Sequence, residues 1–79
     1  MAIRVRIKIS TLKRAIALLN MSQNAFARAT GISPSYLAEL LKGPKLPSPA
    51  TRKRMLEVLS GYTFDDIFYI EDGESDQRH

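Results

Sequence analysis

The sequence predicts a mainly α protein of four to five helices, closed by a small two-stranded antiparallel sheet. Three observations carry this prediction. Apolar residues recur at helical spacing through the middle of the chain. Gly residues and Ser-Pro pairs interrupt that spacing at short intervals, so the helices must be short and separate. On either side of the helical region, the composition is instead the β-branched and aromatic one of strands.

The first strand is predicted at 3–9, where "IRVRIKI" alternates Ile and Val with Arg and Lys. A period of two places alternate side chains on opposite faces of a strand. We therefore expect one buried apolar face, formed by Ile3, Val5, Ile7 and Ile9.

A first helix is predicted at about 11–20, with Ser10 or Thr11 as its N-cap. Its apolar positions have the spacing of one helix face. The side chains expected to point inward are Leu12, Ala15, Ile16 and Leu19.

A second helix is predicted at 23–30 because Ser22 can cap its start and Gly31 can end it in the left-handed conformation. This helix is expected to bury Phe26 and Ala27. The break at Gly31 forces a sharp corner before the next helix begins.

The same start signal, Ser as N-cap followed by Pro at the first helical position, occurs at Ser33 and at Ser48. It predicts helices at 34–42 and at about 49–60. The residues expected to face the core from these two helices are Leu37, Leu40, Leu41, Met55, Leu56 and Leu59.

A capping turn at 64–67 and a closing strand at 67–71 are predicted after the helices. A lone strand cannot satisfy its backbone, so the two terminal strands are expected to pair antiparallel. Residues 1–72 then form a single domain, and the polar segment 73–79 is predicted to be disordered.

Charge is distributed unevenly along the chain. Residues 1–54 carry eleven Lys and Arg against one acid, Glu39, whereas residues 55–79 carry seven acids against Arg78. Such polarity predicts a polyanionic partner for the first two thirds, although a solvated surface with segregated charges remains the alternative.

The sequence lacks the residue combinations that would indicate a catalytic site. There is no cysteine, the single histidine is His79 at the terminus, and no Gly-rich phosphate loop is present. We therefore expect no enzyme activity, no metal and no cofactor. The lack of cysteine and of a long apolar run predicts a cytoplasmic protein without a membrane partner.

Five positions in register, Gln23, Ala27, Gly31, Leu37 and Leu40, resemble the lambda-repressor-like (Cro and phage-repressor, XRE-type) helix-turn-helix family. The resemblance covers roughly residues 11–68. It implies a transcriptional regulator, expected to be a repressor, that binds double-stranded DNA as a homodimer on a near-palindrome.

The resemblance also implies which residues contact DNA, because the family's third helix lies in the major groove. Here that recognition helix is 34–42. The expected base contacts are Ser33, Ser35, Tyr36 and Glu39. The expected phosphate contacts are Ser22, Gln23, Lys42, Lys45 and Ser48.

Each of these residues also has a structural interpretation. The serines can be helix caps only, Tyr36 can pack against the second helix, and Glu39 can pair with Lys42. The basic strand residues can blunt a sheet edge or touch flanking DNA. The buried Arg–Glu pair of many relatives is replaced here by Ile16 and Leu41.

A second functional hypothesis is an antitoxin or other protein-interaction module that keeps the fold but has a protein as its main ligand. It is supported by the outward face of helix 34–42, which carries no Arg, Asn or Gln to distinguish bases. A lack of any preferred DNA sequence would favour this hypothesis.

Overall fold

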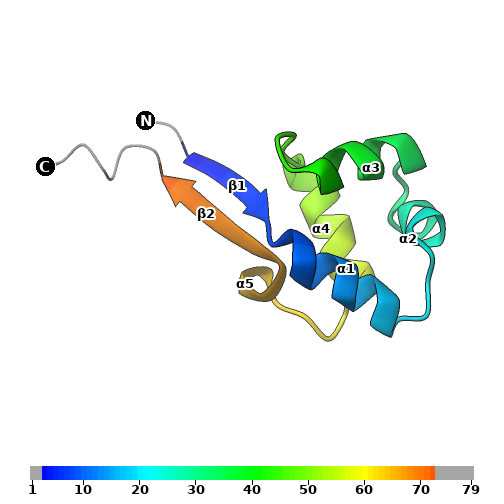
Figure 1. Ribbon diagram of the computed structural model, residues 1–79. Helices are drawn as coiled ribbons and strands as arrows, with labels where there is room; N and C mark the ends of the chain where they lie inside the picture. Colours follow the sequence, from blue (N-terminus) through cyan, green and yellow to red (C-terminus); the bar gives the residue numbers. More distant parts are fainter. Residues whose placement is uncertain (1–2, 73–79) are drawn as a thin grey trace, which may run out of the picture.

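The computed structural model describes residues 3–72, and the predicted disordered segment 73–79 lies outside them. Its helices form a body from which the two strands project as an arm, and the described chain begins and ends at the tip of that arm (Figure 1). The elements in chain order are β1 (Ile3–Ile7), α1 (Ile9–Leu18), α2 (Gln23–Thr30), α3 (Pro34–Lys42), α4 (Pro49–Val58), α5 (Phe64–Ile67) and β2 (Phe68–Asp72). The predicted mainly helical fold with an antiparallel strand pair is thus confirmed.

Serine side chains cap three helices as the sequence predicts. The Oγ atoms of Ser22, Ser33 and Ser48 accept hydrogen bonds from the backbone N–H three residues later, at 3.0, 3.0 and 3.2 Å. At the end of α2, Gly31 has φ 76° and ψ 22°. This left-handed conformation disfavours any side chain with a Cβ, so glycine makes the corner between α2 and α3.

The start of α1 differs from the prediction of a strand at 3–9 and a helix at about 11–20. The strand ends at Ile7, the helix begins at Ile9, and neither Ser10 nor Thr11 is the N-cap. Lys8 forms the corner, because its N–H donates to the Ile67 carbonyl at 2.7 Å and holds the chain against α5. This bond to a residue far along the chain outweighs the local capping preference.

The end of α1 also comes earlier than predicted. The helix stops at Leu18, and Asn20 adopts φ 60°, which a helix does not tolerate. Leu19, expected in the core, is 38% exposed as a result. Two smaller differences are that α4 ends at Val58 rather than near residue 60, and that β2 covers Phe68–Asp72 rather than 67–71.

The strands pair antiparallel, with Val5 opposite Ile70 and Ile7 opposite Phe68. The prediction that the apolar strand face is buried is wrong for its outer part. Ile7 is buried, Val5 is half-buried and Ile3 is 57% exposed, because the arm extends beyond the helices that could cover it.

One apolar core joins all the helices to the base of the arm. Ile16 and Leu41, which stand where many relatives have a buried Arg–Glu pair, are both buried in this core. The predicted core residues of α2 and α3 are buried too, whereas Leu56 of α4 is only half-buried. The core comprises Ile7, Leu12, Ala15, Ile16, Phe26, Ala27, Leu37, Leu40, Leu41, Met55, Leu59, Ile67 and Phe68. Within residues 3–72, no helix has the length and apolar character needed to cross a membrane.

Candidate nucleic-acid interface

Helix α3 has one buried and one exposed face. Leu37, Leu40 and Leu41 anchor the helix to the core. On the other side, Ser35, Glu39 and Lys42 are exposed, as is Ser33 at the N-cap. This arrangement leaves polar side chains exposed to solvent along a helix whose diameter suits the DNA major groove.

The N-terminus of α2 presents backbone N–H groups together with the exposed side chains of Ser22 and Gln23. The Ser22 Oγ already accepts a hydrogen bond from the Ala25 N–H, and its hydroxyl proton can still be donated to an anion. The helix dipole adds partial positive charge at this end. The expected phosphate contacts of Ser22 and Gln23 therefore lie at a helix end suited to phosphate.

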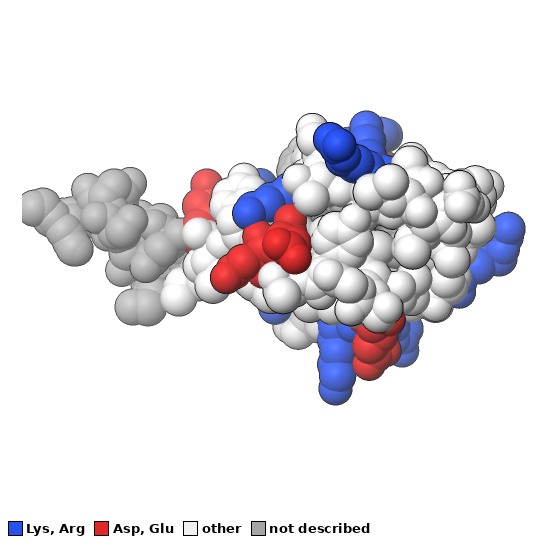
Figure 2. Space-filling view, turned by 90° about the horizontal axis from the view of Figure 1, so that it is seen from below, with Lys and Arg blue, Asp and Glu red and all other residues white. Residues whose placement is uncertain are grey.

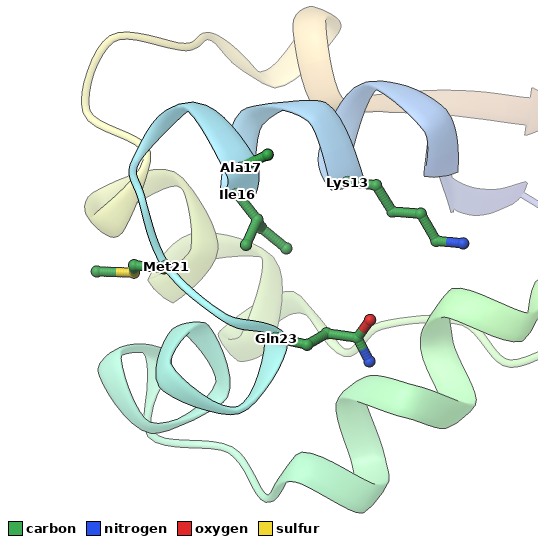
Figure 3. Close-up of a pocket in the computed structure, with 5 residues that line it drawn as sticks. All are labelled: Lys13, Ile16, Ala17, Met21 and Gln23. Atoms are coloured by element: carbon green, nitrogen blue, oxygen red, sulfur yellow. The ribbon is translucent and has the colours of Figure 1, made fainter.

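A residue that sequence reasoning missed, Lys13, lies beside this helix end. Lys13, Ile16, Ala17, Met21 and Gln23 line an open hollow of about 300 Å³ between α1 and the start of α2. Figure 3 shows the side chains of Lys13 and Gln23 extending in the same direction, while Met21 points the other way. Helical periodicity predicts only the apolar face of α1, and the position of Lys13 beside Gln23 depends on how α1 and α2 pack.

Tyr36 is half-buried and lies against the loop that follows α3 rather than standing free. Its hydroxyl oxygen accepts from the Ser48 backbone N–H at 3.4 Å, and the Lys45 ammonium lies 5.3 Å from the ring centre. Burial raises the pKa of Tyr36, but hydrogen bonds with Thr51 and Ser48 and the charge of Lys45 outweigh it and hold the pKa below its ordinary value. The expected packing of Tyr36 was against α2, whereas these contacts join α3 to the start of α4.

Ser48 is held by several bonds at the first turn of α4. Its Oγ donates to the Thr51 Oγ1 at 2.9 Å and accepts from the Thr51 N–H, while its own N–H is bonded to Tyr36. The interpretation of Ser48 as a cap is confirmed. Its phosphate contact stays a prediction, and it requires the Oγ proton to turn away from Thr51.

Glu39 and Lys42 form an ion pair across one turn of α3, with 3.5 Å between Lys42 Nζ and Glu39 Oε2. Both side chains are more than half exposed, so water screens the pair and either group can exchange it for a DNA contact at little cost. The structural interpretation of the pair is confirmed, and the base contact of Glu39 stays a prediction.

The basic residues of the predicted first strand are engaged in contacts within the arm and with α5. Arg6 Nε donates to Glu71 Oε1 at 2.7 Å, and Arg4 lies 3.7 Å from the same oxygen. Lys8 Nζ donates to the Asp65 carbonyl at 2.6 Å. These contacts favour the structural interpretation of the basic strand face over a role in contacting DNA.

The face turned away from α3 has a different character. Figure 2 shows a wide uncharged area there, with acidic side chains gathered near the base of the arm. Asp65 and Asp66 belong to α5 at that base. The acidic side chains of α5 thus lie on a different face from the recognition helix, whose only acid is Glu39.

In the part of the chain that the structure describes, no three His, Cys, Asp or Glu side chains are grouped to hold a metal ion.

Comparison with known proteins agrees with this geometry. No curated protein and no solved structure gave a match. A model of a helix-turn-helix family, whose members are DNA-binding regulatory domains rather than enzymes, matches residues 12–67. The chain therefore belongs to the XRE-type, lambda-repressor-like helix-turn-helix family.

Proposed function

We propose that this DNA-binding regulator is a sequence-specific repressor that acts in the cytoplasm as a homodimer on a near-palindromic site. Helix α3 enters the major groove, and the N-terminus of α2 binds the phosphate backbone beside it. The observation that carries this proposal is the exposed polar face of α3, on a helix that packs against α2, whose N-terminus presents Ser22 and Gln23. A twofold dimer would place two such faces about 34 Å apart, one turn of DNA.

The contacts divide into two groups with different roles. Ser33, Ser35, Tyr36 and Glu39 are proposed to contact base edges, which determine sequence preference. Phosphate contacts are proposed for the larger set that surrounds them, and they position the helix without sequence information. That set is Lys13, Ser22, Gln23, Lys42, Lys45 and Ser48.

A second candidate function, a protein-interaction module such as an antitoxin, is favoured by one observation. The exposed residues of α3 are Ser35, Glu39 and Lys42 with Pro34, a set that lacks the bidentate side chains typical of base recognition. In this case DNA binding would be electrostatic only.

Chemical-shift mapping by NMR tests which surface binds DNA. A duplex of random sequence is added to the labelled protein, and the amide shifts are followed. We expect the largest changes at the start of α2, along α3 and in the loop 43–48, and small changes at α5. Changes spread evenly over basic residues of every element, or an absence of changes, would contradict the proposed interface.

A further inference from the structure

The hydrogen-bond phase of the strand pair determines which backbone groups face outward. The Lys8 N–H donates to the Ile67 carbonyl, so Lys8 and Ile67 form a hydrogen-bonded pair. Hydrogen-bonded and non-hydrogen-bonded pairs alternate along an antiparallel ladder. Arg6–Tyr69 and Arg4–Glu71 are therefore hydrogen-bonded pairs, and Val5–Ile70 is a non-hydrogen-bonded pair. The N–H and C=O groups of Ile70 and Val5 point away from the partner strand, toward the two edges of the sheet.

The apolar side chains on the same part of the arm lack a cover. Ile3 and Ile70 are 57% and 59% exposed, and both lie on the face that continues from Ile7 and Phe68 in the core. A two-stranded sheet is marginally stable in water. An exposed edge next to exposed β-branched residues is the usual template for another strand.

We propose that β2 pairs antiparallel with β2 of a second copy of this chain, with the twofold axis at Ile70. The pairing joins two arms into one four-stranded sheet with the order β1-β2-β2-β1. This inference rests on the proposed function, which requires a dimer. It adds the surface and the strand register by which the dimer forms.

Charge excludes the other edge. The outward N–H and C=O groups of β1 belong to its odd-numbered residues. In a twofold pairing of β1 with its copy, odd-numbered residues must therefore lie opposite odd-numbered residues to bond. The even-numbered residues then lie opposite even-numbered residues. Every register that pairs more than one residue of β1 sets an arginine against an arginine: Arg4 against Arg4, Arg4 against Arg6, or Arg6 against Arg6. Like charges directly opposite in a sheet are destabilising.

Charge also selects the register of β2. A twofold axis at Glu71 would set Glu71 against Glu71 in a close, non-hydrogen-bonded pair. An axis at Ile70 instead places Glu71 opposite Tyr69 of the second copy, and it sets the two Ile70 side chains together on the apolar face. Ile70 is the middle residue of β2, so this register aligns the full length of the strand, with the Phe68 N–H remaining bonded to the Phe64 carbonyl at each end.

The interface is small. A strand of five residues buries less than the about 800 Å² per partner that is usual for a stable complex. We therefore expect a weak dimer in free solution, which forms more readily when two copies occupy adjacent half-sites and raise each other's effective concentration.

Sedimentation equilibrium at rising protein concentration tests the proposal with a matched pair of variants. Ile70→Lys places two charges at the axis, whereas Ile3→Lys adds the same charge to the same face at nearly equal exposure but on the other strand. We expect concentration-dependent dimers for the native chain and for Ile3→Lys, and monomers for Ile70→Lys. Dimers of Ile70→Lys, equal loss in both variants, or a native chain that stays monomeric would overturn the proposal.

Hydrogen exchange gives a second measurement that needs no variant. The Ile70 amide has no acceptor in its own sheet, so it should exchange quickly in dilute protein and become protected as the dimer forms. The Val5 amide, which faces the other edge, should stay unprotected. Protection of neither amide, or of Val5 alone, would contradict the pairing.

DNA binding is tested separately, so that the two proposals can fail independently. Ile70→Lys should bind a duplex with one half-site as the native chain does and lose cooperative binding to two half-sites. If the native chain fails to bind the duplex with one half-site, the proposed function is contradicted, and the dimer result is unaffected.

Discussion

The Tyr36 hydroxyl accepts a hydrogen bond from the Ser48 N–H, and this contact ties the recognition helix to the first turn of α4. Lys45 lies between the two residues along the chain and above the Tyr36 ring. Tyr36 therefore holds in place a loop that is expected to contact phosphate.

Tyr36→Phe tests this role, because it keeps the ring and removes the hydroxyl. A hydrogen bond of this kind contributes about 0.5–1.5 kcal/mol, so we expect roughly 2- to 10-fold weaker DNA binding. If Tyr36 acts by holding the loop, the loss should be equal for all sequences in an anisotropy titration. A loss confined to duplexes changed at one base pair would instead show that the hydroxyl acts through the base contact proposed for Tyr36 and not through the loop.

Gly31→Ala should destabilise the fold, because φ 76° strains any residue with a Cβ. The strain costs about 1–2 kcal/mol in the free energy of unfolding, which a urea titration measures. The new Cβ would also lie 3.1 Å from the Arg54 guanidinium, which can move aside. Gly61→Ala is the matched control, since nothing lies within 4 Å of a Cβ there, and a similar loss in that variant would refute the explanation.

Phosphate and base contacts should respond differently to alanine. Gln23→Ala and Lys42→Ala are expected to weaken binding to every duplex alike, whereas Ser35→Ala and Glu39→Ala should change sequence preference. Binding of each variant to a panel of single-base-pair substitutions measures both effects. Equal losses for all four variants across the panel would show that the base contacts are assigned wrongly.

Lys13→Ala tests the residue that the hollow beside α2 identifies. Loss of one phosphate contact should lower the slope of log affinity against log salt concentration by about one. Lys53→Ala, an exposed lysine in α4, is the control of equal charge and should leave the slope nearly unchanged. Equal slopes for the two variants would remove Lys13 from the interface.

The arm should loosen in acid because of Glu71. The hydrogen bond from Arg6 holds the pKa of Glu71 below its ordinary value of 4.5 against the opposing effect of burial, and the charges of Arg6 and Arg4 also lower this pKa. A lowered pKa stabilises the folded form above the ordinary value, and the stabilisation is lost as pH falls through the folded pKa. We expect the Arg6 and Tyr69 amides to lose exchange protection as the pH falls below 4.5, and Glu71→Gln to lack this dependence. The same acid loss in Glu71→Gln would exclude Glu71 as its cause.

The sequence predicts α2, α3 and the start of α4 because their signals are local. Ser22, Ser33 and Ser48 cap from the position next to the helix, and Gly31 ends α2 by its own backbone conformation. The start of α1 could not be predicted this way, since it depends on the bond between Lys8 and Ile67.

In the candidate site, too, some features follow from the local sequence and others depend on contacts between distant segments. The exposed face of α3 follows from periodicity alone, so its residues were predictable. The place of Lys13 beside Gln23 and the contact of Tyr36 with Ser48 depend on how helices pack, which periodicity does not encode. The exposure of Ile3 has the same origin, because a period of two marks an apolar face but not whether anything covers it.

Helix α3 is proposed to recognise a DNA sequence. Selection of bound duplexes from a random library by the purified native chain, in moderate salt and followed by sequencing, tests it most directly. We expect an enriched motif with twofold symmetry and half-sites about one helical turn apart. Salt-sensitive binding without any enriched sequence would contradict it and favour a protein as the main ligand.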